Sequence, residues 1–156
     1  MRFELGIDNK FKKFWKFYLL QSLLAGIAMF ILVLILGQKN MVVVSSMGAT
    51  TFILFALPNA YSAQTRNVIG GHLIGLLVGT IFYFTALPYW LEYPLVIAVA
   101  ILIMVIVNAE HPPAAGTALA VVINEVSIGV CATIILSTIV LTQVRYYLRH
   151  HLQNLL

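Results

Sequence analysis

A short polar segment interrupts the apolar second half of the sequence and carries two ionisable side chains. Residues 108–117 read Asn-Ala-Glu-His-Pro-Pro-Ala-Ala-Gly-Thr, so Glu110 and His111 stand directly before two prolines. The prolines end any preceding helix and hold His111 in an extended conformation, and the second proline suits the first turn of a new helix. Free N–H groups at the start of that helix, up to Thr117, attract an anion.

Three roles are compatible with His111. As a donor, it binds an anion together with the backbone amides of residues 115–117. As a proton carrier beside Glu110, it couples anion movement to protons, because an unperturbed histidine titrates near pH 6.5. In the structural alternative, the prolines only set the chain direction and His111 caps a carbonyl. A metal or hydrolytic site is not expected, since this spacing fits no zinc motif and Asp8 is the only aspartate.

A second polar segment precedes the third apolar stretch. Residues 63–67 read Ala-Gln-Thr-Arg-Asn, and Arg66 is the only arginine between residues 2 and 145. A guanidinium offers five donors in a planar fork that suits small oxyanions. We therefore expect Arg66 and Asn67 to contact an anion. The alternative is that Arg66 is a snorkelling anchor that only sets the topology.

Three glycines recur at four-residue spacing directly after this segment. Gly71, Gly75 and Gly79 form a double GxxxG pattern, which places them on one helix face where another backbone can approach closely. His72 projects within about 20° of Gly79, so it belongs to the packed side. A histidine at membrane depth favours a place in a transport pathway, and a simply hydrogen-bonded packing histidine is the alternative.

The composition places these segments in a membrane. Of the 156 residues, 62% are hydrophobic and only 9% are charged, and the mean hydropathy is +1.00. A soluble domain carries about a quarter charged residues, so an ordinary soluble enzyme, a disordered chain and a disulfide scaffold are poor fits. We predict an integral membrane protein with one transmembrane domain over residues 1–156, no enzymatic activity, and no cofactor or metal.

The positive charges lie outside the apolar segments. The net charge is +4, but four lysines between residues 10 and 16 precede the first apolar run, and Arg145 and Arg149 follow the last. This positive-inside pattern predicts two cytoplasmic termini, with 1–16 as a basic amphipathic lead-in and 145–156 as a cytoplasmic tail. The lipid bilayer, and not nucleic acid, is the expected partner. The lack of a recognisable plastid transit peptide favours a bacterial inner membrane.

Long and short apolar segments alternate along the chain. The first, third and sixth reach the roughly 20 residues that cross a bilayer, and the fourth does so if its helix continues through residues 108–110. The second and fifth are short, so they either cross or re-enter on one side, and the charges of Arg66 and Glu92 slightly favour six crossings over four. The six segments are 17–36, 41–57, 68–87, 95–107, 113–123 and 126–144.

The fold class is therefore all-α, with four long transmembrane helices and two short helical segments. The order long, short, long occurs twice, and both short segments carry clusters of small residues, at 45–51 and 114–118. With three crossings in each half, the second half is inverted relative to the first. Such inverted repeats are typical of transporters whose site lies near the bilayer midplane.

Two blocks resemble the HPP transmembrane family, which is named for its His-Pro-Pro. One is NAEHPPAAGTALAVVI at 108–123, and the other is SSMGATTFILFALPNAYSAQTRNVIGGHLIGLLVG at 45–79. The second block shares with that family, in order, Ser46, Gly48, Ala49, Leu54, Phe55, Pro58, Ala63, Gln64, Arg66, Asn67, Gly71 and His72.

The resemblance implies four spanning helices and a role in small-anion transport, since plastid and cyanobacterial members are associated with nitrite. We expect a transporter or channel for a small monovalent oxyanion, nitrite favoured; the alternative is a non-transporting membrane scaffold or assembly subunit. A homo-oligomer through the glycine face is also expected. The expected substrate-binding residues are Ser46, Arg66, Asn67, His72, His111 and Thr117.

Overall fold

Six α-helices make up most of the chain in a computed structural model, which describes residues 9–36, 41–125 and 127–155. No strand occurs among these residues, so the predicted all-α class is confirmed. The helices are α1 (Asn9–Leu36), α2 (Met41–Ala56), α3 (Thr65–Tyr83), α4 (Tyr89–Ile106), α5 (Pro113–Ile123) and α6 (Ile128–Leu148), with short 3-10 turns η2 (Tyr61–Ala63) and η3 (Arg149–His151).

Four of these helices are long and apolar enough to cross a membrane. The qualifying segments are Phe11–Ile35, Thr65–Tyr83, Tyr89–Ile106 and Ile128–His151. Helices α2, with 16 residues, and α5, with 11 residues, are shorter than these four segments. At 1.5 Å per residue, α5 is about 16 Å long, roughly half of the hydrocarbon thickness. The predicted combination of four long and two short helices is therefore confirmed.

The fourth helix reaches its length in a different way from the one predicted. From the sequence, the apolar run from Leu95 reaches crossing length only if its helix continues through residues 108–110, and this continuation does not occur. The helix ends at Ile106, and Asn108 adopts a left-handed backbone with φ of 57°, a conformation that asparagine tolerates. The helix instead begins earlier, at Tyr89, and runs through Pro94.

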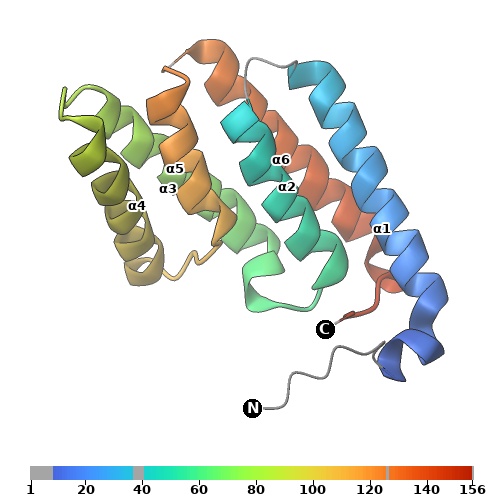
Figure 1. Ribbon diagram of the computed structural model, residues 1–156. Coiled ribbons are helices and arrows are strands. Elements are labelled where there is room, and N and C mark those ends of the chain that lie inside the picture. Colours follow the sequence, from blue (N-terminus) through green and yellow to red (C-terminus); the bar gives the residue numbers. More distant parts are fainter. Residues whose placement is uncertain (1–8, 37–40, 126, 156) are drawn as a thin grey trace.

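The helices alternate in direction between two ends of the bundle (Figure 1). The start of α1, the α2–α3 and α4–α5 junctions and the end of α6 lie at one end, and the other helix ends lie opposite. Both short helices therefore join opposite ends, as the long ones do. Three helices of the first half and three of the second run in opposite senses, which is the arrangement that an inverted repeat requires.

Glycines allow α3 to approach α5 closely. A Cβ atom on Gly71 would lie 2.8 Å from the Cβ of His111, one on Gly75 would lie 2.4 Å from the carbonyl oxygen of Ala114, and one on Gly79 would lie 2.5 Å from that of Ala118. The glycine face is thus covered by α5 of the same chain. An oligomer through this face, as we expected from the sequence, is incompatible with this packing.

The C-terminal residues are fastened to α1 and α2 by buried polar contacts. Gln21 in α1 is 1% exposed, and its amide donates to the carbonyl of Gln153 (2.9 Å) and accepts from the amide N–H of Gln153 (3.0 Å). The Leu155 amide donates to the Ala56 carbonyl at 3.0 Å. In a bilayer such groups need internal partners, and the two segments provide them for each other.

The alternating arrangement predicts six crossings, which labelling can test. Asn59 follows α2 and Trp90 lies at the start of α4, and both side chains are exposed. Single cysteines at these sites, on a Cys131→Ser background, should react from opposite sides of the membrane, with residue 59 on the same side as a cysteine at exposed Asn154. If residue 59 instead reacts from the side opposite to residue 154, the short helices are re-entrant and the six-crossing topology is wrong.

Candidate functional site

Two histidines and a threonine meet in the interior where α2, α3 and the start of α5 come together. Thr50 Oγ1 lies 2.9 Å from Nε2 of His72 and 3.1 Å from Nε2 of His111. The two imidazole rings have their centroids 5.0 Å apart. One hydroxyl therefore bridges two histidines that are 39 residues apart in the sequence (111 − 72).

Two further hydroxyls extend this contact chain. Nδ1 of His72 lies 2.7 Å from Oγ1 of Thr117, which lies 2.8 Å from Oγ of Ser46. Ser46 also donates to the carbonyl of Pro113 at 2.7 Å. We call Ser46, Thr50, His72, His111 and Thr117 the hydroxyl–imidazole cluster.

The cluster is enclosed by the protein. Ser46 is 5% exposed, His72 is 2% exposed, and the other three members are 0% exposed. Polar groups inside a membrane protein are costly unless they pair with one another, and they tend to mark ion and substrate pathways. The cluster is thus a candidate functional site on physical grounds alone.

The sequence around His111 fixes the position of its ring. The second proline begins α5, as predicted from the His-Pro-Pro motif, and Asn108 reverses the chain before it. His111 Nδ1 then donates to the Ser62 carbonyl at 2.8 Å, which ties the ring to η2 and leaves Nε2 directed at Thr50.

The amides at the start of α5 are partly used within their own turn. The N–H of Ala114 donates to the His111 carbonyl at 2.9 Å, and that of Ala115 donates to the Pro112 carbonyl at 3.2 Å. These two donors are therefore not free for an anion in this conformation. The polar side chains, more than the helix terminus, supply the chemistry of the site.

Arg66 and Asn67 lie outside the cluster. The Arg66 side chain is exposed, and its guanidinium donates to the Asn108 carbonyl, so it links the start of α3 to the α4–α5 connection. Asn67 is 0% exposed and donates to the Tyr61 carbonyl at 2.8 Å, while its Oδ1 has no hydrogen-bond partner among the described residues. Both residues thus contact the connections at the α2–α3 and α4–α5 end of the bundle.

Thr50 is the member that sequence reasoning missed. Its segment, residues 45–51, was described by its small residues, and Ser46 alone was taken from it as a site residue. The usable signal is the four-residue spacing of Ser46 and Thr50, which places both hydroxyls on one face of an otherwise apolar helix. Both face α5 and the histidines.

Each histidine also borders a cavity. One cavity, of about 260 Å³, is lined by Ile101, Met104, Val105, Glu110, His111, Pro112 and Ala115. The other, of about 180 Å³, is lined by Ile69, His72, Leu73, Leu76, Ile135, Thr138 and Ile139. The two histidines that contact Thr50 thus line two different cavities, which share no lining residue.

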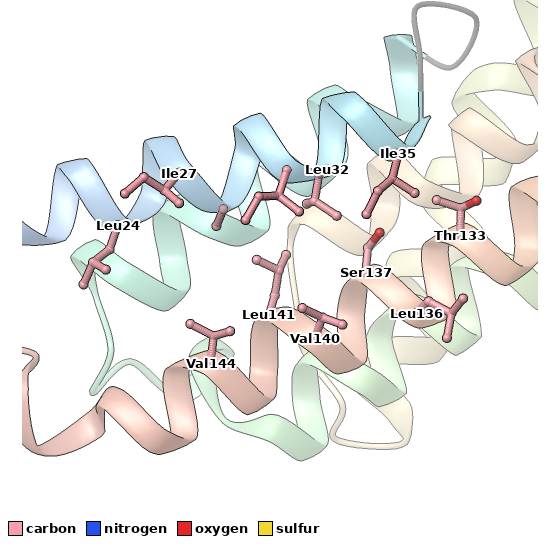
Figure 2. Close-up of a pocket in the computed structure, with 12 residues that line it drawn as sticks. Leu24, Ile27, Leu32, Ile35, Thr133, Leu136, Ser137, Val140, Leu141 and Val144 are labelled. Carbon is pink, nitrogen blue, oxygen red and sulfur yellow. The ribbon is translucent and has the colours of Figure 1, made fainter.

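A further cavity lies away from the cluster and is a poor place for an anion. It has a volume of about 440 Å³ between α1 and α6. Figure 2 shows leucine, isoleucine and valine side chains of the two helices pointing toward one another, with Thr133 and Ser137 as the polar exceptions. Such a surface suits hydrocarbon and offers no cationic donor.

Comparison with known proteins places the chain in a family. A transmembrane protein of Dictyostelium discoideum is 31% identical over 88 residues, which are 54% of this chain and 31% of that protein. The chain thus spans about a third of the length of this relative. No solved structure gives a significant match. The family model described as "HPP, transmembrane region" matches residues 11–153, and the chain therefore belongs to the HPP transmembrane family.

Proposed function

We propose that this multi-pass membrane protein moves a small monovalent oxyanion, with nitrite as the favoured substrate. The observation that carries the proposal is the buried hydroxyl–imidazole cluster. Nitrite is small and planar and needs only a few donors and a path shielded from lipid. Hydroxyl and imidazole N–H groups are suitable donors, and no other group of this kind is enclosed at the α2, α3 and α5 contact in the described residues.

The cavity beside His111 is the proposed entrance. Its volume is about 260 Å³, while a water molecule occupies roughly 30 Å³ in the liquid, so a three-atom anion fits with water beside it. Glu110 lines the same cavity, and Arg66 contacts Asn108 two residues earlier. Arg66 therefore supplies positive charge to the chain segment that leads into this cavity, and positive charge attracts anions.

Uptake by liposomes tests the proposal. Purified protein should speed nitrite entry above the rate of protein-free liposomes at the same pH, since nitrous acid crosses lipid unaided. An uptake rate equal to that of protein-free liposomes, at several pH values and with an imposed potential, would contradict transport. Co-purification of another protein at fixed stoichiometry would then favour the alternative of a membrane scaffold.

Arg66 provides a specific prediction within this proposal. Arg66→Lys keeps the charge but loses the planar fork, so nitrite uptake should become weaker, and Arg66→Gln should weaken it further. The expected effect is a higher half-saturation concentration without loss of membrane insertion. The matched control is Arg149→Gln, because Arg149 is also exposed and contacts Tyr146 and His150 and no cluster residue. Normal uptake by Arg66→Gln would leave Arg66 as a topology anchor only.

A further inference from the structure

The hydrogen-bond directions in the cluster can be assigned from its two ends. A carbonyl oxygen only accepts, so Ser46 uses its proton on Pro113, and the Ser46–Thr117 contact must use the proton of Thr117. The next contact then needs the Nδ1–H of His72 as donor. Neutral His72 therefore turns the lone pair of its Nε2 toward Thr50.

The same reasoning applies from the His111 side. Its Nδ1–H donates to the Ser62 carbonyl, so neutral His111 also turns the lone pair of Nε2 toward Thr50. The Thr50 hydroxyl has a single proton, and the Ser46 carbonyl at 3.1 Å is a third acceptor for it. With both histidines neutral, one imidazole nitrogen at this hydroxyl is left without a proton.

One added proton resolves the shortage. If it sits on His111, the Nε2–H of His111 donates to Thr50 and Thr50 donates to His72; if it sits on His72, both directions reverse. The two arrangements satisfy the same contacts. We propose that His72, Thr50 and His111 form a proton-sharing bridge that holds one excess proton, and that the protein moves one proton together with each anion. This inference rests on the proposed function for its anion.

Transfer along the bridge conserves atoms and charge. His111 gives its Nε2 proton to Thr50 Oγ1 while the Thr50 hydroxyl gives its own proton to His72 Nε2. One N–H and one O–H bond break, one O–H and one N–H bond form, and the positive charge moves from His111 to His72. Because His111 lines one cavity and His72 lines another, the charge passes from a residue of the first cavity to a residue of the second.

The two histidines are the titratable groups within the bridge, and Glu110 is a titratable group beside it. Hydroxyls face it from α2 and α5, and Thr138 of α6 lines the cavity beside His72. Met104 of α4 and the carboxylate of Glu110 line the cavity beside His111. A proton on the bridge gives the site a positive charge for the anion, and one proton with one monovalent anion carries no net charge.

The test measures nitrite and lumenal pH together in liposomes that contain an enclosed pH dye. Wild type should acidify the lumen in step with nitrite uptake, beyond the protein-free rate, and an imposed potential should leave the rate unchanged. Thr50→Val keeps the side-chain shape but removes the bridging hydroxyl, so the protein-dependent acidification should be lost. Thr50→Ser should retain it.

Thr51→Val is the matched control. Thr51 is the next residue of α2 and is 1% exposed, but its hydroxyl contacts Met47 and Met29 and no histidine. It should acidify the lumen like wild type. Acidification by Thr50→Val at the wild-type rate would overturn the bridge. Nitrite uptake by wild type that is driven by potential without acidification would also overturn it while the proposed function stands.

A titration of the histidines in the absence of any anion tests the proton-sharing bridge even if no nitrite uptake is found or if Thr50→Val does not fold. In protein labelled with 15N-histidine, the substitutions His150→Gln and His151→Gln remove the two exposed histidines. Nitrogen NMR then reports on His72 and His111 alone. On acidification, the Nε2 signals of His72 and His111 should shift together as they share the first proton, and Thr50→Ser should keep this behaviour. Independent titration of the two rings would overturn the proposal.

Discussion

Replacing Gly75 with alanine is expected to force α3 and α5 apart and to lower stability and anion uptake together. The new Cβ atom would lie 2.4 Å from the Ala114 carbonyl oxygen and 3.3 Å from Cβ of Thr117. The obstacle is backbone, which cannot rotate away as a side chain can. Overpacking of this kind costs about 1–3 kcal/mol. The midpoint of thermal unfolding in detergent should fall by roughly 2–4 °C for each kcal/mol lost.

Gly26→Ala is the matched control for this loss. A Cβ atom on Gly26 in α1 would have nothing within 4 Å, and alanine is favoured over glycine in a helix by about 1 kcal/mol. Its unfolding midpoint should stay the same or rise. In Gly75→Ala, the separation of α3 from α5 should also lengthen the contact between Nδ1 of His72 and Oγ1 of Thr117, which is 2.7 Å in the native protein. If Gly75→Ala and Gly26→Ala have the same unfolding midpoint, α3 and α5 have room for a Cβ atom at residue 75, and the expected loss of stability is wrong.

Both end residues of α5, Pro113 and Ile123, could be predicted because the residues next to each end determine where the helix begins and stops. Two prolines precede it and set its first turn, and the apolar run stops at Asn124. The start of α4 was missed because we equated the helix with the unbroken apolar run from Leu95. The first turn of α4 carries Glu92 and aromatic residues, so it is helical without being uniformly apolar.

Only part of the site could be predicted, because residues that are close together in the sequence can lie at different depths along the helix bundle. His72 lies on the glycine face, where helical periodicity placed it. Arg66 lies six residues earlier, which is about 9 Å along a helix, and so it stays at the end of the bundle. Thr50 joins His72 to His111 through tertiary packing of three separate segments, and a single sequence gives no direct signal for such a contact.

His111→Gln is expected to reduce nitrite uptake to the rate of protein-free liposomes. Glutamine can still donate to the Ser62 carbonyl, which His111 contacts at 2.8 Å, so the fold should be retained. Its amide cannot hold the added proton, however, and it cannot alternate between donor and acceptor toward Thr50 at a single nitrogen. The loss should therefore affect the maximal rate at every pH from 5.5 to 8.

Two companion variants separate this role from that of the prolines. His150→Gln makes the same chemical change at an exposed histidine and should transport normally. Pro112→Ala alters the motif itself, but Pro112 is exposed with φ of −50° and ψ of −39°, values that alanine adopts readily. It should cost only about 0.4–1 kcal/mol of stability through the unfolded chain and keep uptake.

The pattern across the three variants decides what the His-Pro-Pro motif does. Loss of uptake in His111→Gln alone would place the function in the imidazole, with the prolines serving to start α5 and aim the ring. A raised half-saturation concentration with an unchanged pH profile would instead make His111 an anion donor without a proton role. If His111→Gln matches wild type in rate, affinity and pH profile while Pro112→Ala fails to fold, the motif is structural and the assignment of His111 to the site is wrong.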